Sequence, residues 1–178
     1  LEDTDESIWF GTENGDIYRQ SQDGVTAISK PDELGSNQIS VMLVQSNQNL
    51  WVGTIGGGLS LLERSIPANY DRSYGLPANK ASAMVEDQSG NLWFGFEGGG
   101  SRYDGSRFQN YSLFDSHALP HNEITCLALD HRDRIWAGTE DGFVGFFRDH
   151  EIVPLRGLNS LALGSIGALH SIDETHLW

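Results

Sequence analysis

The side chains that most often bind metals are spread along this 178-residue chain without a recognisable ligand spacing. None of the six histidines pairs with another at the spacing of a helical metal site or of a zinc finger. His117 and His121 only flank Pro120 in an expected loop. We therefore expect no metal site and no bound cofactor. The histidines are His117, His121, His131, His150, His170 and His176.

The carboxylates and the single cysteine give no sign of a catalytic centre. Acidic pairs such as Glu140-Asp141 lie in expected turns. A glycosidase needs two carboxylates that converge in one cleft, one of them with a raised pKa, and a sequence alone does not show convergence. Cys126 lies in the apolar run 124–127, which is typical of a small buried residue and not of a reactive thiol. We therefore expect no catalytic residues and no enzymatic activity.

The charge balance limits the partners. Lysine and arginine number 11, aspartate and glutamate 25, and the net charge is −14. Binding to nucleic acid or to anionic lipid requires basic patches, so neither partner is expected. No apolar stretch reaches the ~18 residues that a membrane helix needs, so we expect no direct membrane contact.

The elements that position these residues are set by a repeat marked by tryptophan. The five tryptophans of the chain are 42 or 43 residues apart, and the same Trp-x-Gly phrase surrounds the first four. A period of about 40 to 45 residues is typical of four-stranded propeller blades. The repeated pairs are Trp9 with Gly11, Trp51 with Gly53, Trp93 with Gly95, and Trp136 with Gly138, and Trp178 ends the chain.

Each repeat contains about four short apolar or alternating segments separated by Gly-, Asn- and Asp-containing turns, such as 39–44, 50–54 and 59–62 in the second repeat. No stretch of ten or more residues has a helical period. The prediction is an all-β propeller of four-stranded antiparallel blades. The expected blades are 1–35, 36–78, 79–121 and 122–164, with a partial blade at 165–178.

The repeated residue types have separate expected roles. The tryptophan is expected to wedge between neighbouring blades, and the glycine two residues later to leave room for the neighbouring ring. The glycine six residues after each tryptophan is expected to adopt a positive φ in a hairpin; these are Gly15, Gly57, Gly99 and Gly142. An aspartate six residues before the tryptophan is expected to cap the preceding turn; Asp3, Asp87 and Asp130 hold this place, and Gln45 does so in the second repeat.

Two features of these repeats resemble the two-component regulator propeller family. One is the phrase Glu86-Asp87-Gln88-Ser89-Gly90-Asn91-Leu92-Trp93-Phe94-Gly95, and the other is the connector seen as Gly75-Leu76-Pro77-Ala78-Asn79 and Ala118-Leu119-Pro120-His121-Asn122. The resemblance covers the whole chain in about four copies, although Phe96 replaces the usual threonine of the third. WD repeats have a similar period, but their Trp-Asp ending is absent here.

The resemblance implies a non-enzymatic recognition module of a bacterial transmembrane signalling regulator. It implies a periplasmic location, with a histidine kinase or diguanylate cyclase output elsewhere in the parent protein. The partner would be a small ligand, such as a saccharide, or a protein. Two alternatives stay open: a lyase- or hydrolase-type propeller enzyme, and a purely structural interaction scaffold.

If a ligand binds, propeller geometry favours the blade-linking loops and hairpins of one face. The candidate residues there are Asn37, Asn79, Asn122, Glu13, Glu97 and Glu140, although the asparagines are as well explained as caps of the incoming strand. Because Leu177-Trp178 repeats Ile8-Trp9, we expect an arc of a larger ring, which either belongs to a longer chain or self-associates through its open blade edges.

Overall fold

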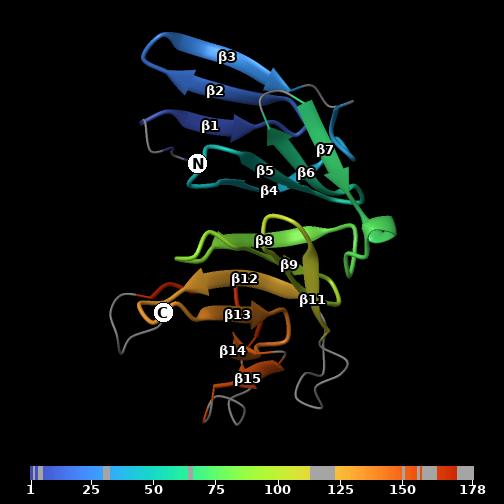
Figure 1. The fold of residues 1–178 in the computed structure, drawn as a ribbon, viewed down its shortest axis with the longest axis vertical. Helices are drawn as coiled ribbons and strands as arrows, with labels where there is room; N and C mark the ends of the chain where they lie inside the picture. Colours follow the sequence, from blue (N-terminus) through green and yellow to red (C-terminus); the bar gives the residue numbers. More distant parts are fainter. Residues whose placement is uncertain are drawn as a thin grey trace. The chain divides into compact units, whose positions relative to one another are not determined.

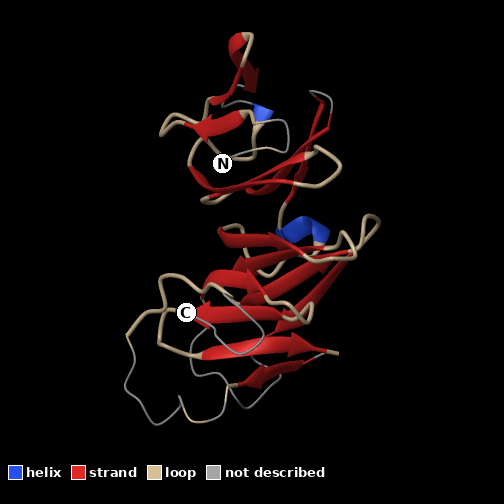
Figure 2. Cartoon of the chain, turned by 90° about the vertical axis from the view of Figure 1, so that its left-hand side faces the viewer, coloured by secondary structure: helices blue, strands red, loops and turns tan. Residues whose placement is uncertain are grey.

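The computed structural model is all-β, as predicted, and describes residues 1, 3, 6–29, 33–63, 66–112, 123–149, 151–155, 157 and 164–171. Short antiparallel strands make up nearly all of the regular structure, with a 3-10 turn at Arg72–Tyr74 (Figure 2). In this described part of the chain, no helix is long and apolar enough to cross a membrane.

The chain divides into two compact units, Leu1–Ala81 and Ser82–Trp178, each built on two sheets (Figure 1). The first unit contains β1 (Ile8–Gly11), β2 (Ile17–Ser21) and β3 (Gly24–Ser29) in one sheet, and β4 (Ile39–Val44), β5 (Leu50–Thr54), β6 (Gly58–Glu63) and β7 (Ile66–Tyr70) in the other. The second contains β8 (Ala81–Glu86), β9 (Leu92–Phe96), β10 (Gly99–Tyr103) and β11 (Phe108–Ser112), and then β12 (Ile124–Leu129), β13 (Ile135–Thr139), β14 (Val144–Arg148) and β15 (Glu151–Pro154).

Strands that follow one another in sequence pair with one another in all four sheets. The first sheet has three strands among the described residues, and the other three sheets have the four that were predicted. Leu1 nevertheless exchanges two backbone hydrogen bonds with Trp9, at 2.7 and 3.1 Å. Leu43 and Ala128 pair in the same way with Trp51 and Trp136, so Leu1 holds the ladder position of an innermost strand.

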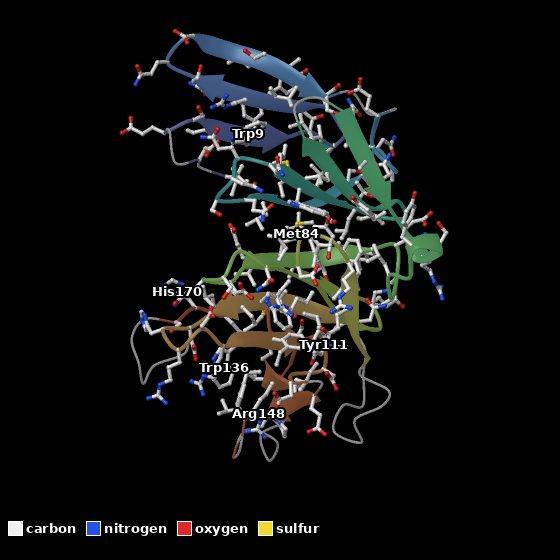
Figure 3. All side chains as sticks on the ribbon, viewed as in Figure 1. Trp9, Met84, Tyr111, Trp136, Arg148 and His170 are labelled. Atoms are coloured by element: carbon white, nitrogen blue, oxygen red, sulfur yellow. The ribbon has the colours of Figure 1, made fainter. Side chains whose placement is uncertain are left out.

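Trp9, Trp93 and Trp136 each pack against the next element along the chain within their own unit. Trp9 lies in a core with Leu50 and Val52 of the second sheet (Figure 3), and Trp93 packs on the core of the β12–β15 sheet. The predicted wedge is therefore confirmed within both units. It buries large aromatic surface between sheets whose facing sides are apolar.

The glycine two residues after each tryptophan makes room for a different side chain from the one predicted. A Cβ on Gly95 would lie 2.6 Å from Ile124 Cγ2, and one on Gly138 would lie 2.6 Å from Ile166 Cγ2. In both places the neighbour is thus a β-branched side chain, and not an aromatic ring.

The hairpin glycines mostly behave as expected. Gly15, Gly99 and Gly142 have positive φ values of 87°, 139° and 88°. In the second hairpin the positive φ falls on Gly56 and Gly58, which flank the predicted Gly57. The third glycine of this run allows the turn to shift by one residue without strain.

One face of the first sheet is exposed where its equivalents are buried. Ile8 and Phe10 are 48% and 39% exposed, whereas the matching residues Leu50 and Val52 are almost fully buried. In the second sheet this face receives Trp9. Self-association through such a face stays a prediction.

Candidate functional site: a pocket between the first two sheets

A pocket of about 340 Å³ lies between the first two sheets, within the first unit. Its volume is within the range of about 300 to 1,000 Å³ that is usual for small-molecule sites. Apolar side chains from four strands and polar side chains from one turn line it together. The lining residues are Asp3, Trp9, Arg19, Ile28, Asn47, Gln48, Asn49, Leu50 and Leu62.

One wall is built by a cross-strand pair. Trp9 of β1 lies opposite Arg19 of β2, and the Arg19 guanidinium carbon is 5.3 Å from the centre of the Trp9 ring. The indole Nε1 of Trp9 donates a hydrogen bond to Asp3 Oδ2 at 3.1 Å. Trp9 and Asp3 are each 8% exposed, so their hydrogen bond is nearly shielded from water, and the half-buried Arg19 covers the Trp9 ring.

The opposite polar wall is the turn between β4 and β5. The turn closes through a hydrogen bond from Gln48 N to Gln45 O at 2.7 Å, and Gln48 takes a left-handed φ of 69°. The backbone N–H of Asn49 donates to Asn47 Oδ1 at 3.0 Å. These two bonds present three amide side chains in a row at the mouth of the pocket.

The equivalent gap in the second unit is closed by aromatic rings. The ring centre of Phe147 lies 4.9 Å from that of Trp93 and 5.2 Å from that of Tyr111. Trp136 pairs with Phe146, and Phe147 is the next residue; Trp51 pairs with Leu61, and Leu62 is the next residue. Leu62 is therefore equivalent to Phe147. Figure 3 labels Tyr111 in this unit.

The aspartate six residues before each tryptophan does more than cap its turn. Asp87 Oδ1 accepts from the backbone N–H groups of Ser89 and Asn91, as predicted, while Oδ2 accepts from Trp93 Nε1 at 2.9 Å. Asp130 serves Trp136 in the same way at 2.8 Å. The constant offset of six residues was a usable signal for this second bond, and its meaning was missed.

These bonds set the ionisation of the two carboxylates. Burial alone would raise the pKa of Asp87, but hydrogen bonds from the Trp93 and Asn91 side chains and from backbone N–H groups outweigh it and lower the pKa. The pKa of Asp130 is lowered by the same balance, with Trp136 as its strongest donor. Both groups therefore stay charged and fix the indoles at neutral pH.

In the first unit, the predicted ligand residues Glu13 and Asn37 lie at the other end of the strands from the pocket. Glu13, Asn37, Glu97 and Glu140 are exposed, and Asn122 lies outside the described residues. Asn79 is half-buried; its Oδ1 accepts from Arg72 N at 2.9 Å and its carbonyl accepts from Gly56 N at 2.8 Å, which fits the capping alternative.

Of these six candidates, the structure brings Glu97 and Glu140 together. Glu97 forms an isolated bridge with Glu123, whose carbonyl accepts from Glu140 N at 3.1 Å. The described residues contain no group of three or more His, Cys, Asp or Glu arranged to hold a metal ion. A ligand role for the predicted residues stays a prediction.

Among the described residues, Cys126, His131 and His170 do not line the pocket. Cys126 is buried in β12, as expected, and burial raises the pKa of its thiol. His131 and His170 are exposed, and His117, His121, His150 and His176 lie outside the described residues. The pocket therefore combines hydrogen-bonding and apolar groups suited to binding.

A series of hydroxyl groups ties the innermost strands together, and the sequence reading overlooked it. Ser82 Oγ donates to the carbonyl of Ile124, and Thr125 Oγ1 donates to that of Ile166 at 2.5 Å. Ser40 Oγ donates to Ala81 O at 2.5 Å. The signal was a hydroxyl residue at a 42- or 43-residue spacing inside otherwise apolar strands.

Comparison with sequence families supports the repeat assignment in part of the chain. The family described as two component regulator propeller matches residues 75–98 and 118–141. Both segments contain a connector followed by a strand, turn and tryptophan strand. No curated protein matches the sequence.

Solved structures show the same fold over nearly the whole chain. A catalytically inactive virginiamycin B lyase from Staphylococcus aureus superposes with a TM-score of 0.81 at 15% identity, covering 100% of this chain and 60% of the lyase. The extracellular domain of a hybrid two component system from B. thetaiotaomicron gives 0.75 at 25% identity, covering 95% of this chain and 23% of that domain. PorZ, a surface component of the type-IX secretion system of Porphyromonas gingivalis, gives 0.66 at 15%, covering 95% and 29%.

The chain thus spans well under two thirds of the length of each of these proteins. Similarity at 15% identity shows the fold alone. The comparisons establish a partial β-propeller in which two segments match the two component regulator propeller repeat.

Proposed function

We propose that the chain is a non-enzymatic recognition module in the periplasmic region of a bacterial transmembrane signalling regulator. The observation that carries the proposal is the match of two repeats to the two component regulator propeller family. The similarity to an extracellular domain of a hybrid two component system, at 25% identity, supports the same assignment. The output is proposed to be a histidine kinase or a diguanylate cyclase.

The pocket is the proposed place of recognition. Its mixed polar and apolar lining is the usual composition of a small-molecule site, in which apolar walls provide affinity and a few polar groups provide orientation. A small ligand, such as a saccharide, or a protein segment is the proposed partner.

The test uses the receptor that carries this chain, with its signalling output measured in cells against a panel of saccharides and peptides. Arg19→Ala should abolish the response to the active ligand, because it removes a charged wall of the pocket. Arg107→Ala is the matched control, since its side chain is 81% exposed in the second unit. An output that responds equally in both variants would refute a role for the pocket.

A lyase-type enzyme is the second candidate, favoured by the TM-score of 0.81 with virginiamycin B lyase. Incubation of the purified chain with cyclic depsipeptides and polyuronates, followed by mass spectrometry, tests it. A new product formed in proportion to protein concentration would replace the sensing proposal with an enzymatic one.

A further inference from the structure

The first unit lacks two rings that fill the corresponding space in the second. Phe147 and Tyr111 pack beside Trp93, whereas Leu62 and Ile28 lie beside Trp9. By strand pairing Ser29 holds the position of Tyr111, because Ser29 pairs with Ile17 as Tyr111 pairs with Gly100, and Ile28 is the extra residue at the register shift before it. The pocket is therefore a space of the shape that aromatic side chains occupy elsewhere in the same chain.

A hydrogen-bonding group faces this space because one residue of the repeat differs. In the third repeat, the Asn91 amide donates to both oxygens of Asp87, at 3.0 and 2.9 Å. In the second repeat the aspartate is replaced by Gln45, which accepts from Trp51 Nε1 at 3.3 Å. The Asn49 side chain, which matches Asn91, makes no hydrogen bond within the described part of the chain, and it lines the pocket.

The charges of the wall select against ionic ligands. Asp3 disfavours an anion, and so does the net charge of −14 over the whole chain. Arg19 disfavours a cation at the same wall. A neutral ring with a group that both donates and accepts hydrogen bonds suits the apolar walls and the Asn49 amide together, and a phenol is neutral below its pKa of about 10.

We propose that this pocket binds a phenol group, from either a free phenolic molecule or a tyrosine side chain of a peptide. The proposal rests on the proposed recognition function and names the ligand class for its site. The space is sufficient, since an apolar cavity of about 150 Å³ already holds benzene in another protein.

The experiment is a titration of the full 178-residue chain with p-cresol, followed by NMR and by calorimetry. We expect saturable binding with shifts confined to the Trp9 indole and the Asn49 amide. Leu62→Phe and Ile28→Tyr should each weaken p-cresol at least tenfold, because each places an aromatic ring in the space that the ligand would occupy. Val25→Phe is the matched control, because this β3 side chain is 61% exposed and its enlargement should leave affinity unchanged.

Asn49→Ala separates ring recognition from hydroxyl recognition. It should weaken p-cresol about fivefold to tenfold and leave toluene unchanged, as expected for the loss of one hydrogen bond. N-acetyltyrosinamide that binds more tightly than p-cresol would identify a peptide as the source of the phenol, and tighter p-cresol would identify a free compound.

Two results would overturn the inference. One is the absence of p-cresol binding to the folded chain. The other is binding that Leu62→Phe and Ile28→Tyr leave intact while both variants keep the dispersed NMR spectrum of the parent. Binding of methyl glucoside in place of p-cresol, blocked by the same two variants, would reject the phenol and retain the proposed recognition function.

Discussion

The two gaps between sheets, one in each unit, share a tryptophan on one wall and differ in what faces it. Trp9 faces Leu62 and leaves an open pocket, whereas Trp93 faces Phe147 at 4.9 Å and the space is filled. The second gap also has a bond across its turn end, from Gln88 N to Asp133 Oδ1 at 2.9 Å. The comparison shows that the tryptophan holds two sheets together, while the facing residue decides whether the gap can receive a ligand.

The largest expected loss of stability comes from removing the ring that closes the gap in the second unit. Phe147→Ala should cost about 3 to 5 kcal/mol of unfolding free energy, because a buried ring leaves a cavity against Trp93 and Tyr111. Leu62→Ala should cost less, about 2 to 3 kcal/mol, because its space is already partly open. Urea denaturation of both variants checks the order, and equal losses would show that the pocket is not a packing defect.

The two gaps should also differ in how much stability is lost when a methyl group is added to the glycine two residues after the tryptophan. Gly95→Ala places its methyl 2.6 Å from the branched Cγ2 of Ile124, which cannot move independently of the strand, so we expect a loss of about 1 to 3 kcal/mol. Gly11→Ala meets the terminal Cδ1 of Ile39 at 2.8 Å, which can rotate away, and should lose less than about 1 kcal/mol. Thermal unfolding of the pair measures the difference, and a larger loss for Gly11→Ala would contradict it.

Replacing the residue that accepts the indole hydrogen bond should give a pH-dependent loss of stability in the third repeat, where it is Asp87. The loss should not depend on pH in the second repeat, where it is Gln45. Asp87→Ala should lose about 1 to 2 kcal/mol at pH 7, through the lost bonds to Trp93 and to its turn. Because the folded-state pKa of Asp87 is lowered, its contribution is complete above the unfolded pKa of about 3.9 and disappears as pH falls through the folded value. The parent and the variant should therefore converge in stability below pH 4.

The control for this pH dependence is Gln45→Ala, which removes a neutral acceptor of the Trp51 indole at 3.3 Å. Its loss should be smaller and constant between pH 3 and 7. A pH-dependent difference for Gln45→Ala would show that the titration belongs to another group.

The smallest expected effect concerns the left-handed residue of each turn. Gln48→Gly should stabilise the chain by a few tenths to about 1 kcal/mol, because its φ of 69° strains a residue with a Cβ. Asp133→Gly relieves a φ of 59° but loses the bond to Gln88, so it should give no net gain. Chemical denaturation resolves the two, and a gain for Asp133→Gly would show that this bond contributes little.

Much of the fold could be predicted because the regular spacing of the repeat shows where corresponding strands lie. The spacing of Trp9, Trp51, Trp93 and Trp136 gives the strand carrying each tryptophan, and the flanking Gly-rich turns give its neighbours. Residues 1–7 have the composition of a strand end and a turn, and the two backbone hydrogen bonds between Leu1 and Trp9 agree with it.

The pocket could not be predicted, because the sequence does not show which side chains of neighbouring repeats face each other. Leu62 and Phe147 each lie eleven residues after the tryptophan of their own repeat. The structure is needed to show that this position faces the tryptophan of the preceding repeat, Trp9 or Trp93. A leucine in place of an aromatic residue at one position of the repeat forms no recognisable motif. The predicted ligand residues were therefore those of the linking loops and acidic hairpins.

The hydroxyl and glycine contacts described above all lie at the start of the innermost strands, next to the linking loops. The pocket lies at the opposite end, beside the turn 45–49. The first two sheets therefore approach each other closely at the linking-loop end, where Gly11 leaves room for Ile39, and leave space for a ligand at the turn end.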